Sequence, residues 1–287
     1  DVSKAAQMLN NNFVGLTVNP LKDNKSANTQ VDRTKTPTPS TPRTFSPPEP
    51  KEMLLNNGMR VLMVQRPQLP LTTIGILVNS GSTNDPDKQP GLSQFMTDML
   101  FEGTSNRSSS QIANEIEFLG SHLTNDVSRE HTFIAVSGIS DTTGNGLEII
   151  ADTILNPIFP TEEIERIRKE KLADLQSIQD SADATAAIAT RSILLGSASP
   201  YGHTITGNET SVPAINRDHI QNQYQDMLHN SNKTFLVVGD ISPDNSIELL
   251  NEKFEELPNQ QKNRVDDLVS QNKDQNSPVI YLVDRPG

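Results

Sequence analysis

Short runs of apolar residues alternate with polar ones along the chain, and these runs predict strands at Arg60–Gln65, Thr72–Val78, Thr132–Ser137, Phe235–Gly239 and Val279–Val283. Apolar residues that recur three and four positions apart predict helices between them. The predicted helices are Gly91–Phe101, Ser109–Leu119, Gly144–Leu155, Thr161–Gln179, Ala182–Leu195, Arg217–Leu228 and Asn245–Phe254. Strands and helices are therefore interleaved.

The loops between neighbouring strands are short, which favours antiparallel hairpins over a fully parallel sheet. Two hairpins are predicted in this way, one between the strands that begin at Arg60 and Thr72, the other between Leu123 and Thr132. Asn57-Gly58 predicts a tight turn before the first of these strands. The expected fold class is α+β, a curved mixed or antiparallel sheet with helices packed on it.

The chain outside this core is polar. Residues 34–50 (TKTPTPSTPRTFSPPEP) are rich in proline, serine and threonine, which predicts a semi-extended linker, with a ligand for a proline-recognition domain as the alternative. We expect a tail at 1–33, the linker at 34–50, an α+β domain at 51–260, and a loop and strand at 261–287 that lead to a second domain. A short likeness between 1–13 and 240–254 suggests that the tail ends a preceding repeat; an unrelated capping helix is the alternative.

Composition narrows the classes of function. The formal net charge of −12 argues against nucleic acid or an anionic membrane as the main partner, and allows basic peptides or protein surfaces. The chain has no cysteine, so disulfides, thiolate nucleophiles and zinc–thiolate sites are excluded. No apolar run is long enough to span a membrane. The location is left open, with a periplasmic or other extracytoplasmic one favoured.

The most informative segment is 91–104, which reads GLSQFMTDMLFEGT. It resembles the zinc helix of the insulinase-like (pitrilysin, M16) metallopeptidases. In that family the helix carries His-x-x-Glu-His, in which two histidines bind zinc and the glutamate activates water. Gln94, Thr97 and Asp98 stand at those positions here, so the resemblance implies a degenerate zinc motif. It also implies that Asp174, on the predicted helix 161–179, stands where the family has a third ligand, a glutamate.

The replaced residues differ in what they can still do. Gln94 and Asp98 are four positions apart and share one helix face, so two ligands could still point the same way. An amide oxygen suits calcium or magnesium better than zinc. The hydroxyl of Thr97 stays protonated at neutral pH and cannot serve as the general base. Either Asp98 and Asp174 bind a cation loosely, or they are ordinary polar residues that line a cleft.

Further landmarks occur in the family's order between Met53 and Pro258. They are the Asn57-Gly58 turn, the loop 79–86, Pro200-Tyr201-Gly202-His203 with Gly207, and the run 235–240. One more resembles the edge strand on which active relatives bind their peptide substrate, and it supplies the candidate substrate-binding residues Gly120, Ser121, His122, Leu123, Thr124 and Asn125. An edge strand offers unpaired backbone groups to an extended peptide whether or not a metal is present.

Three hypotheses of function follow from the resemblance. The chain is a non-catalytic half or subunit of a zinc metallopeptidase that helps to enclose and bind peptides or unfolded protein segments. In that case it needs no cofactor of its own, and zinc lies in a homologous partner domain or subunit. The alternatives are a structural or assembly protein that keeps the fold without proteolysis, and a hydrolase with an altered metal site. Whether the chain is itself an enzyme is left open.

Overall fold

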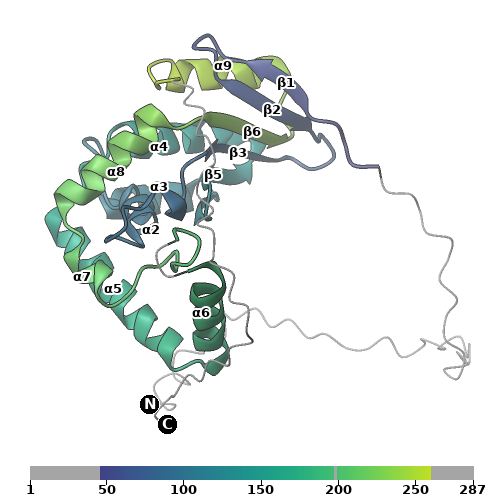
Figure 1. Ribbon diagram of the computed structural model, residues 1–287. Coiled ribbons are helices and arrows are strands. Elements are labelled where there is room, and N and C mark those ends of the chain that lie inside the picture. Colours follow the sequence, from purple (N-terminus) through teal and green to yellow (C-terminus); the bar gives the residue numbers. More distant parts are fainter. Residues whose placement is uncertain (1–45, 197–198, 260–287) are drawn as a thin grey trace, which may run out of the picture. The chain divides into compact units, whose positions relative to one another are not determined.

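The computed structural model describes residues 46–196 and 199–259 (Figure 1). Its strands form one six-stranded sheet in the order β1-β2-β6-β3-β5-β4. Neighbouring strands are antiparallel except β2 and β6, which are parallel. The strands are β1 (Lys51–Leu54), β2 (Arg60–Gln65), β3 (Leu71–Val78), β4 (His122–Val127), β5 (Thr132–Ile139) and β6 (Lys233–Gly239). The predicted strand 279–283, the tail 1–33 and most of the linker lie outside the described residues.

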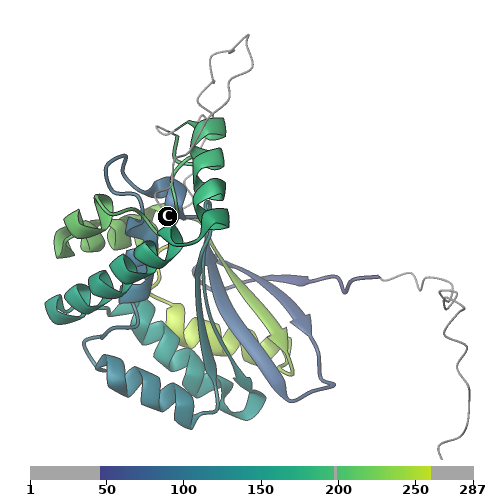
Figure 2. The same ribbon diagram turned by 90° about the horizontal axis from the view of Figure 1, so that it is seen from below.

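Helices cover one face of this sheet (Figures 1 and 2). They are α2 (Leu92–Met99), α3 (Ser109–Phe118), α4 (Thr143–Leu155), α5 (Thr161–Gln179), α6 (Ala182–Leu195), α7 (Ser211–Ala214), α8 (Arg217–Asn230) and α9 (Pro243–Phe254). No helix in the described part of the chain is long and apolar enough to cross a membrane. The α+β class and the mixed sheet with helices packed on it are therefore confirmed.

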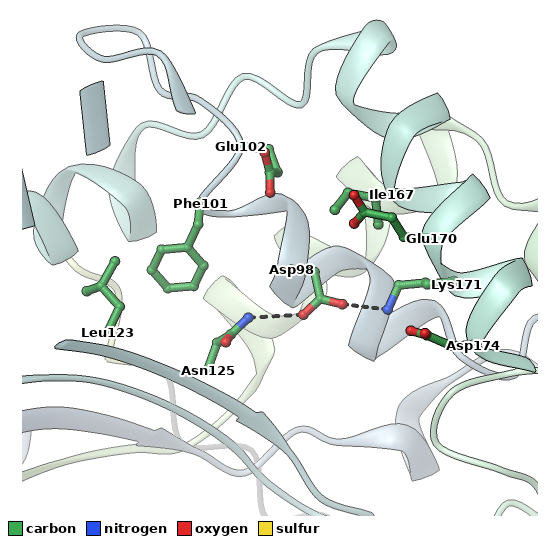
Figure 3. A pocket seen from close by; sticks show the side chains of 9 residues that line it. All are labelled: Asp98, Phe101, Glu102, Leu123, Asn125, Ile167, Glu170, Lys171 and Asp174. Carbon is green, nitrogen blue, oxygen red and sulfur yellow. Dashed lines mark hydrogen bonds and ion pairs between the residues drawn. The ribbon is translucent and has the colours of Figure 1, made fainter. Parts of the chain in front are cut away.

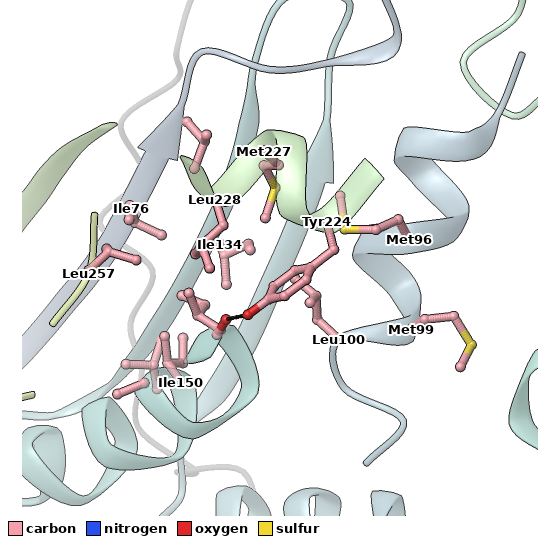
Figure 4. Close-up of a cluster of buried hydrophobic side chains, with 14 of the residues drawn as sticks. Ile76, Met96, Met99, Leu100, Ile134, Ile150, Tyr224, Met227, Leu228 and Leu257 are labelled. Carbon is pink, nitrogen blue, oxygen red and sulfur yellow. Dashed lines mark hydrogen bonds between the residues drawn. The ribbon is translucent and has the colours of Figure 1, made fainter. Parts of the chain in front are cut away.

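The core lies between the helices and the inward face of the sheet. Alternate residues of the strands point into it, among them Ile76 on β3 and Ile134 on β5, which are 2% and 0% exposed. Figure 4 shows Tyr224 of α8 within this apolar cluster. Its hydroxyl donates a 2.8 Å hydrogen bond to the carbonyl of Ile154, so a buried phenol keeps a partner. Burial raises the pKa of Tyr224 to about 12.

One of the two predicted hairpins is correct and the other is wrong. β4 and β5 form an antiparallel pair with a two-residue turn at Arg129 and Glu130. β2 and β3 do not pair with each other, because β6 lies between them, parallel to β2 and antiparallel to β3. The antiparallel partner of β2 on its other side is β1, joined to it through the Asn57-Gly58 turn. The loop between β2 and β3 is short, but these two strands are not neighbours in the sheet.

Candidate functional site

The start of α2 is fixed by a buried carboxylate. Asp85 accepts 2.7 Å hydrogen bonds from the backbone N–H groups of Gly91 and Ser93, the first groups of the helix. Burial raises the pKa of Asp85 to about 6, although these donors act in the opposite direction. The Oγ of Ser93 in turn accepts a 2.9 Å bond from Nε2 of Gln223 on α8. These contacts set the orientation of the helix that carries Gln94, Thr97 and Asp98.

The three motif residues on α2 do not point the same way. Gln94 and Asp98 lie on one face, where Nε2 of Gln94 donates a 2.9 Å bond to Oδ1 of Asp98. Thr97 is fully buried, and its hydroxyl donates to the carbonyl of Ser93 at 2.8 Å. A threonine hydroxyl bound to its own helix is not available to accept a proton from water.

α5 brings the fourth motif residue into the same place. Asp98 and Asp174 both line a pocket of about 390 Å³ between α2, α5 and β4, shown in Figure 3. Phe101, Leu123 and Ile167 supply apolar walls, and the remaining lining residues are Glu102, Asn125, Glu170 and Lys171. The pocket thus contains four carboxylates and one lysine.

Asp98 lies at the centre of the polar contacts in this pocket. Nζ of Lys171 is 2.5 Å from Oδ2 of Asp98, and Nδ2 of Asn125 donates a 3.0 Å bond to Oδ1 of the same carboxylate. Asn125 comes from β4, so Asp98 links α2 to both α5 and β4 (Figure 3). Sequence reasoning placed Gln94, Asp98, Asp174 and Asn125 at a site but left Lys171 out. Its position three residues before Asp174, on the same helix face, was the available signal.

These donors do not fit a zinc ion. Zinc requires several imidazole, thiolate or carboxylate ligands in a tight tetrahedral shell. Here the single carboxylate on α2 is already bound to an ammonium group and two amide N–H groups. Within the described residues there is also no group of three His, Cys, Asp or Glu side chains that could hold a metal ion.

A second ion-pair cluster joins the end of α2 to α5 beside the pocket. Arg166 pairs with Glu102, with Glu163 at 2.6 Å and with Glu170 at 2.8 Å. Burial raises the pKa of Glu102, while the hydrogen bond from Arg166 opposes that rise.

Two cationic side chains of α5 also lie against the fully buried ring of Phe95. Cζ of Arg168 is 5.8 Å and Nζ of Lys171 is 5.7 Å from the ring centroid. The two helices are therefore held together by charge along one side of the pocket.

β4 is the edge strand of the sheet, and in the described part of the chain no strand pairs with its outer side. Of the candidate substrate-binding residues, His122, Leu123, Thr124 and Asn125 lie on β4, while Gly120 and Ser121 precede it. N–H of Ser128 donates to the carbonyl of His131, so the alternation of an antiparallel pair points the backbone groups of Leu123, Asn125 and Val127 outward. The side chains of Leu123 and Asn125 line the pocket beneath the strand.

The fold defines a class of protein, an α+β domain with helices packed on one six-stranded mixed sheet. The family model described as Insulinase (Peptidase family M16) matches residues 60–196, and the Peptidase M16 inactive domain model matches residues 214–286. The chain belongs to the M16 insulinase-like peptidase family. The resemblance inferred from the sequence is thereby confirmed.

Relatives within the family are proteins longer than this chain. The β subunit of mitochondrial-processing peptidase from Dictyostelium discoideum is 30% identical over 208 residues, which are 72% of this chain and 44% of that protein. Subunit 1 of the bovine (Bos taurus) cytochrome b-c1 complex is 33% identical over 131 residues, 46% of this chain and 27% of that protein. This chain therefore spans less than half of the length of these two relatives.

A solved structure shows the same fold. The crystal structure of a peptidase M16 inactive domain from Pseudomonas fluorescens superposes with a TM-score of 0.69 and 22% identity, and the match covers 75% of this chain and 53% of that one. At this identity the likeness supports the fold alone.

Proposed function

We propose that this chain is a non-catalytic M16 domain that binds extended peptide segments along β4 and acts beside a zinc-bearing homologous domain or subunit. The observation that carries the proposal is the combination of a strand edge that no described strand pairs with and a pocket in which Asp98 is already paired with Lys171. Three outward backbone positions offer hydrogen bonds to an added strand, and the pocket below receives its side chains. Catalysis then requires another polypeptide region to supply zinc and the general base.

The comparisons with known proteins support one part of this proposal, that the chain is a non-catalytic M16 domain. The C-terminal part of the chain matches the inactive-domain model of the family, and the mitochondrial-processing peptidase relative is itself described as one subunit of a peptidase. Enclosure of peptides by this chain and its zinc-bearing partner remains our proposal, as does a periplasmic or other extracytoplasmic location. Cell fractionation with an antibody to the chain tests the location.

The test of peptide binding uses a proline on the strand edge. Asn125→Pro removes an outward N–H without removing a bond to β5, because edge strands accept proline at such positions. Asn125→Ala is the matched control, since it loses the same side-chain bond to Asp98 but keeps the N–H. We expect the proline variant to bind a fluorescently labelled unfolded casein fragment about tenfold more weakly than the alanine variant. Equal affinities would argue against strand addition at β4.

The same preparation tests for catalysis. We expect wild-type protein to leave the casein fragment intact with or without added zinc, and to support cleavage only when mixed with its zinc-bearing partner. Zinc-dependent cleavage by this chain alone would instead support a hydrolase with an altered metal site.

A second candidate function is structural. The similarity to cytochrome b-c1 complex subunit 1 favours a role as an assembly component that keeps the fold without proteolysis. A chain that copurifies with a stable complex and binds no unfolded peptide would support this role over the first.

A further inference from the structure

Lys171 is a cation that lines the pocket between α2, α5 and β4. Its side chain is only 12% exposed, and its ammonium group lies 2.5 Å from Asp98, whose side chain is 23% exposed. The ammonium also lies 5.7 Å from the centroid of the Phe95 ring, which favours a positive charge over its face. The lysine is therefore held in place by a carboxylate and an aromatic ring, not merely extended into solvent.

Asp98 has little capacity left for another cation. Its Oδ1 accepts hydrogen bonds from Gln94 and Asn125, and its Oδ2 is paired with Lys171. A divalent ion that approached this carboxylate would meet the ammonium at short range, where repulsion between like charges is strong. Figure 3 shows Asp174, the other carboxylate at a motif position, close to Lys171 on the same helix. The lysine thus pairs with Asp98 and lies three residues before Asp174 on the same helix.

We propose that the ammonium of Lys171 is a tethered cation that closes this pocket to metal ions, so that Asp98 and Asp174 form a divalent-cation site only when the lysine charge is removed. The inference deepens the proposed function, because it rests on the same pocket being non-catalytic. It also assigns a structural role to the lysine: through Asp98 it joins α5 to α2 and, by way of Asn125, to the strand edge.

The test compares four variants of this chain with wild type. Lys171→Met removes the charge and keeps the aliphatic stem, whereas Lys171→Arg keeps the charge. Lys171→Met combined with Asp98→Asn, or with Asp174→Asn, removes the carboxylates on which the new site depends. Binding of Co²⁺ and Zn²⁺ is measured by equilibrium dialysis, and Co²⁺ coordination by its visible absorption.

We expect Lys171→Met to bind these ions at least about tenfold more tightly than wild type, and both double variants to lose the gain. Lys171→Arg should bind no better than wild type. A folded Lys171→Met protein with wild-type metal affinity would overturn the inference, and so would a gain that survives Asp98→Asn. If Lys171→Met does not fold, Lys171→Gln provides the same comparison with a polar side chain.

These outcomes are distinct from failure of the proposed function. Loss of the expected metal gain contradicts only the role of Lys171, while peptide binding at β4 is measured independently with the Asn125 variants. Zinc-dependent cleavage by wild-type protein would contradict both, because it requires a metal to enter the pocket with the lysine present.

Discussion

Gly91 and Gly207 approach each other so closely that a Cβ added to Gly91 would lie 2.6 Å from the Cα of Gly207. Both residues have positive φ angles, 94° at Gly91 and 79° at Gly207. A Cβ on Gly207 would in turn lie 2.6 Å from the carbonyl oxygen of Pro90. The loop after α6 is thereby packed against the start of the motif helix, which explains why Gly207 is needed where the sequence landmark places it.

We expect Gly91→Ala to destabilise the fold by about 2 to 4 kcal/mol, because it adds a backbone clash to an unfavourable φ angle. Gly120→Ala is the matched control. Gly120 also has a positive φ, 61°, but an added Cβ would meet nothing within 4 Å, so only a conformational cost of about 1 kcal/mol is expected. Urea denaturation measures both values. Equal costs at the two glycines would show that the close approach to Gly207 relaxes without penalty.

Local patterns predicted the helices well and the pairing of strands less well. The bounds of α5 and α6 agree with their predicted ranges, because each has a continuous helical period and an identifiable start. The four-residue helix α7 was missed because it is too short to show a period. The neighbour of β2 could not be read from adjacent loops, since β6 follows it by some 170 residues and is placed by the packing of the whole sheet.

For the site, too, local patterns predicted one part of the arrangement, and tertiary packing decided the rest. Spacing alone placed Gln94 and Asp98 on one helix face, and the family resemblance supplied Asp174. The hydroxyl of Thr97 bonds to its own helix, and Lys171 pairs with Asp98. Both contacts depend on how α2 packs against α5, a tertiary relationship that neither spacing nor the motif contains.

The cap of α2 provides the next prediction. Asp85→Ala leaves the buried N–H groups of Gly91 and Ser93 without acceptors, so we expect a loss of about 1 to 3 kcal/mol in the free energy of unfolding. Asp87→Ala, two residues later and exposed, is expected to change it by less than about 0.5 kcal/mol. Thermal and urea unfolding of the two variants check this. Similar losses in both would mean that Asp85 acts only through its charge.

A buried ion-pair network around Asp152 gives a prediction in acid. Arg107 and Thr104 donate to its Oδ2, and Asn106 and Asn156 to its Oδ1. Burial by itself would raise the pKa of Asp152, but these hydrogen bonds outweigh it and lower the pKa below its usual value. The stability contributed by the charged form is therefore present above the unfolded-state pKa and is lost as the pH falls through the folded-state pKa.

We expect Asp152→Asn to cost about 2 to 4 kcal/mol near neutral pH, because the guanidinium of Arg107 loses its most buried partner. The difference from wild type should shrink as the pH is lowered through the acid range. Glu148→Gln removes another partner of Arg107 whose side chain is 53% exposed, and should cost less than about 1 kcal/mol. A gap between wild type and Asp152→Asn that stays constant in acid would contradict the role assigned to the charge.

Lys233, at the start of β6, gives a prediction in the alkaline range. It is 6% exposed, and its Nζ donates to the backbone carbonyls of Ser231 at 2.9 Å and Pro258 at 3.2 Å. Burial lowers the pKa of Lys233 to about 8, from 10.5 for an unperturbed lysine. Between these values the unfolded chain holds a proton that the folded protein has released, so this residue makes the protein more stable as the pH rises.

Relative to Lys233→Met, wild type should therefore gain up to about 3 kcal/mol between pH 8 and 10.5. Lys88→Met, at an exposed position, controls for the loss of one positive charge. Urea denaturation across this pH range measures the difference, and a wild-type advantage that falls with rising pH would show that Lys233 is charged in the folded protein throughout.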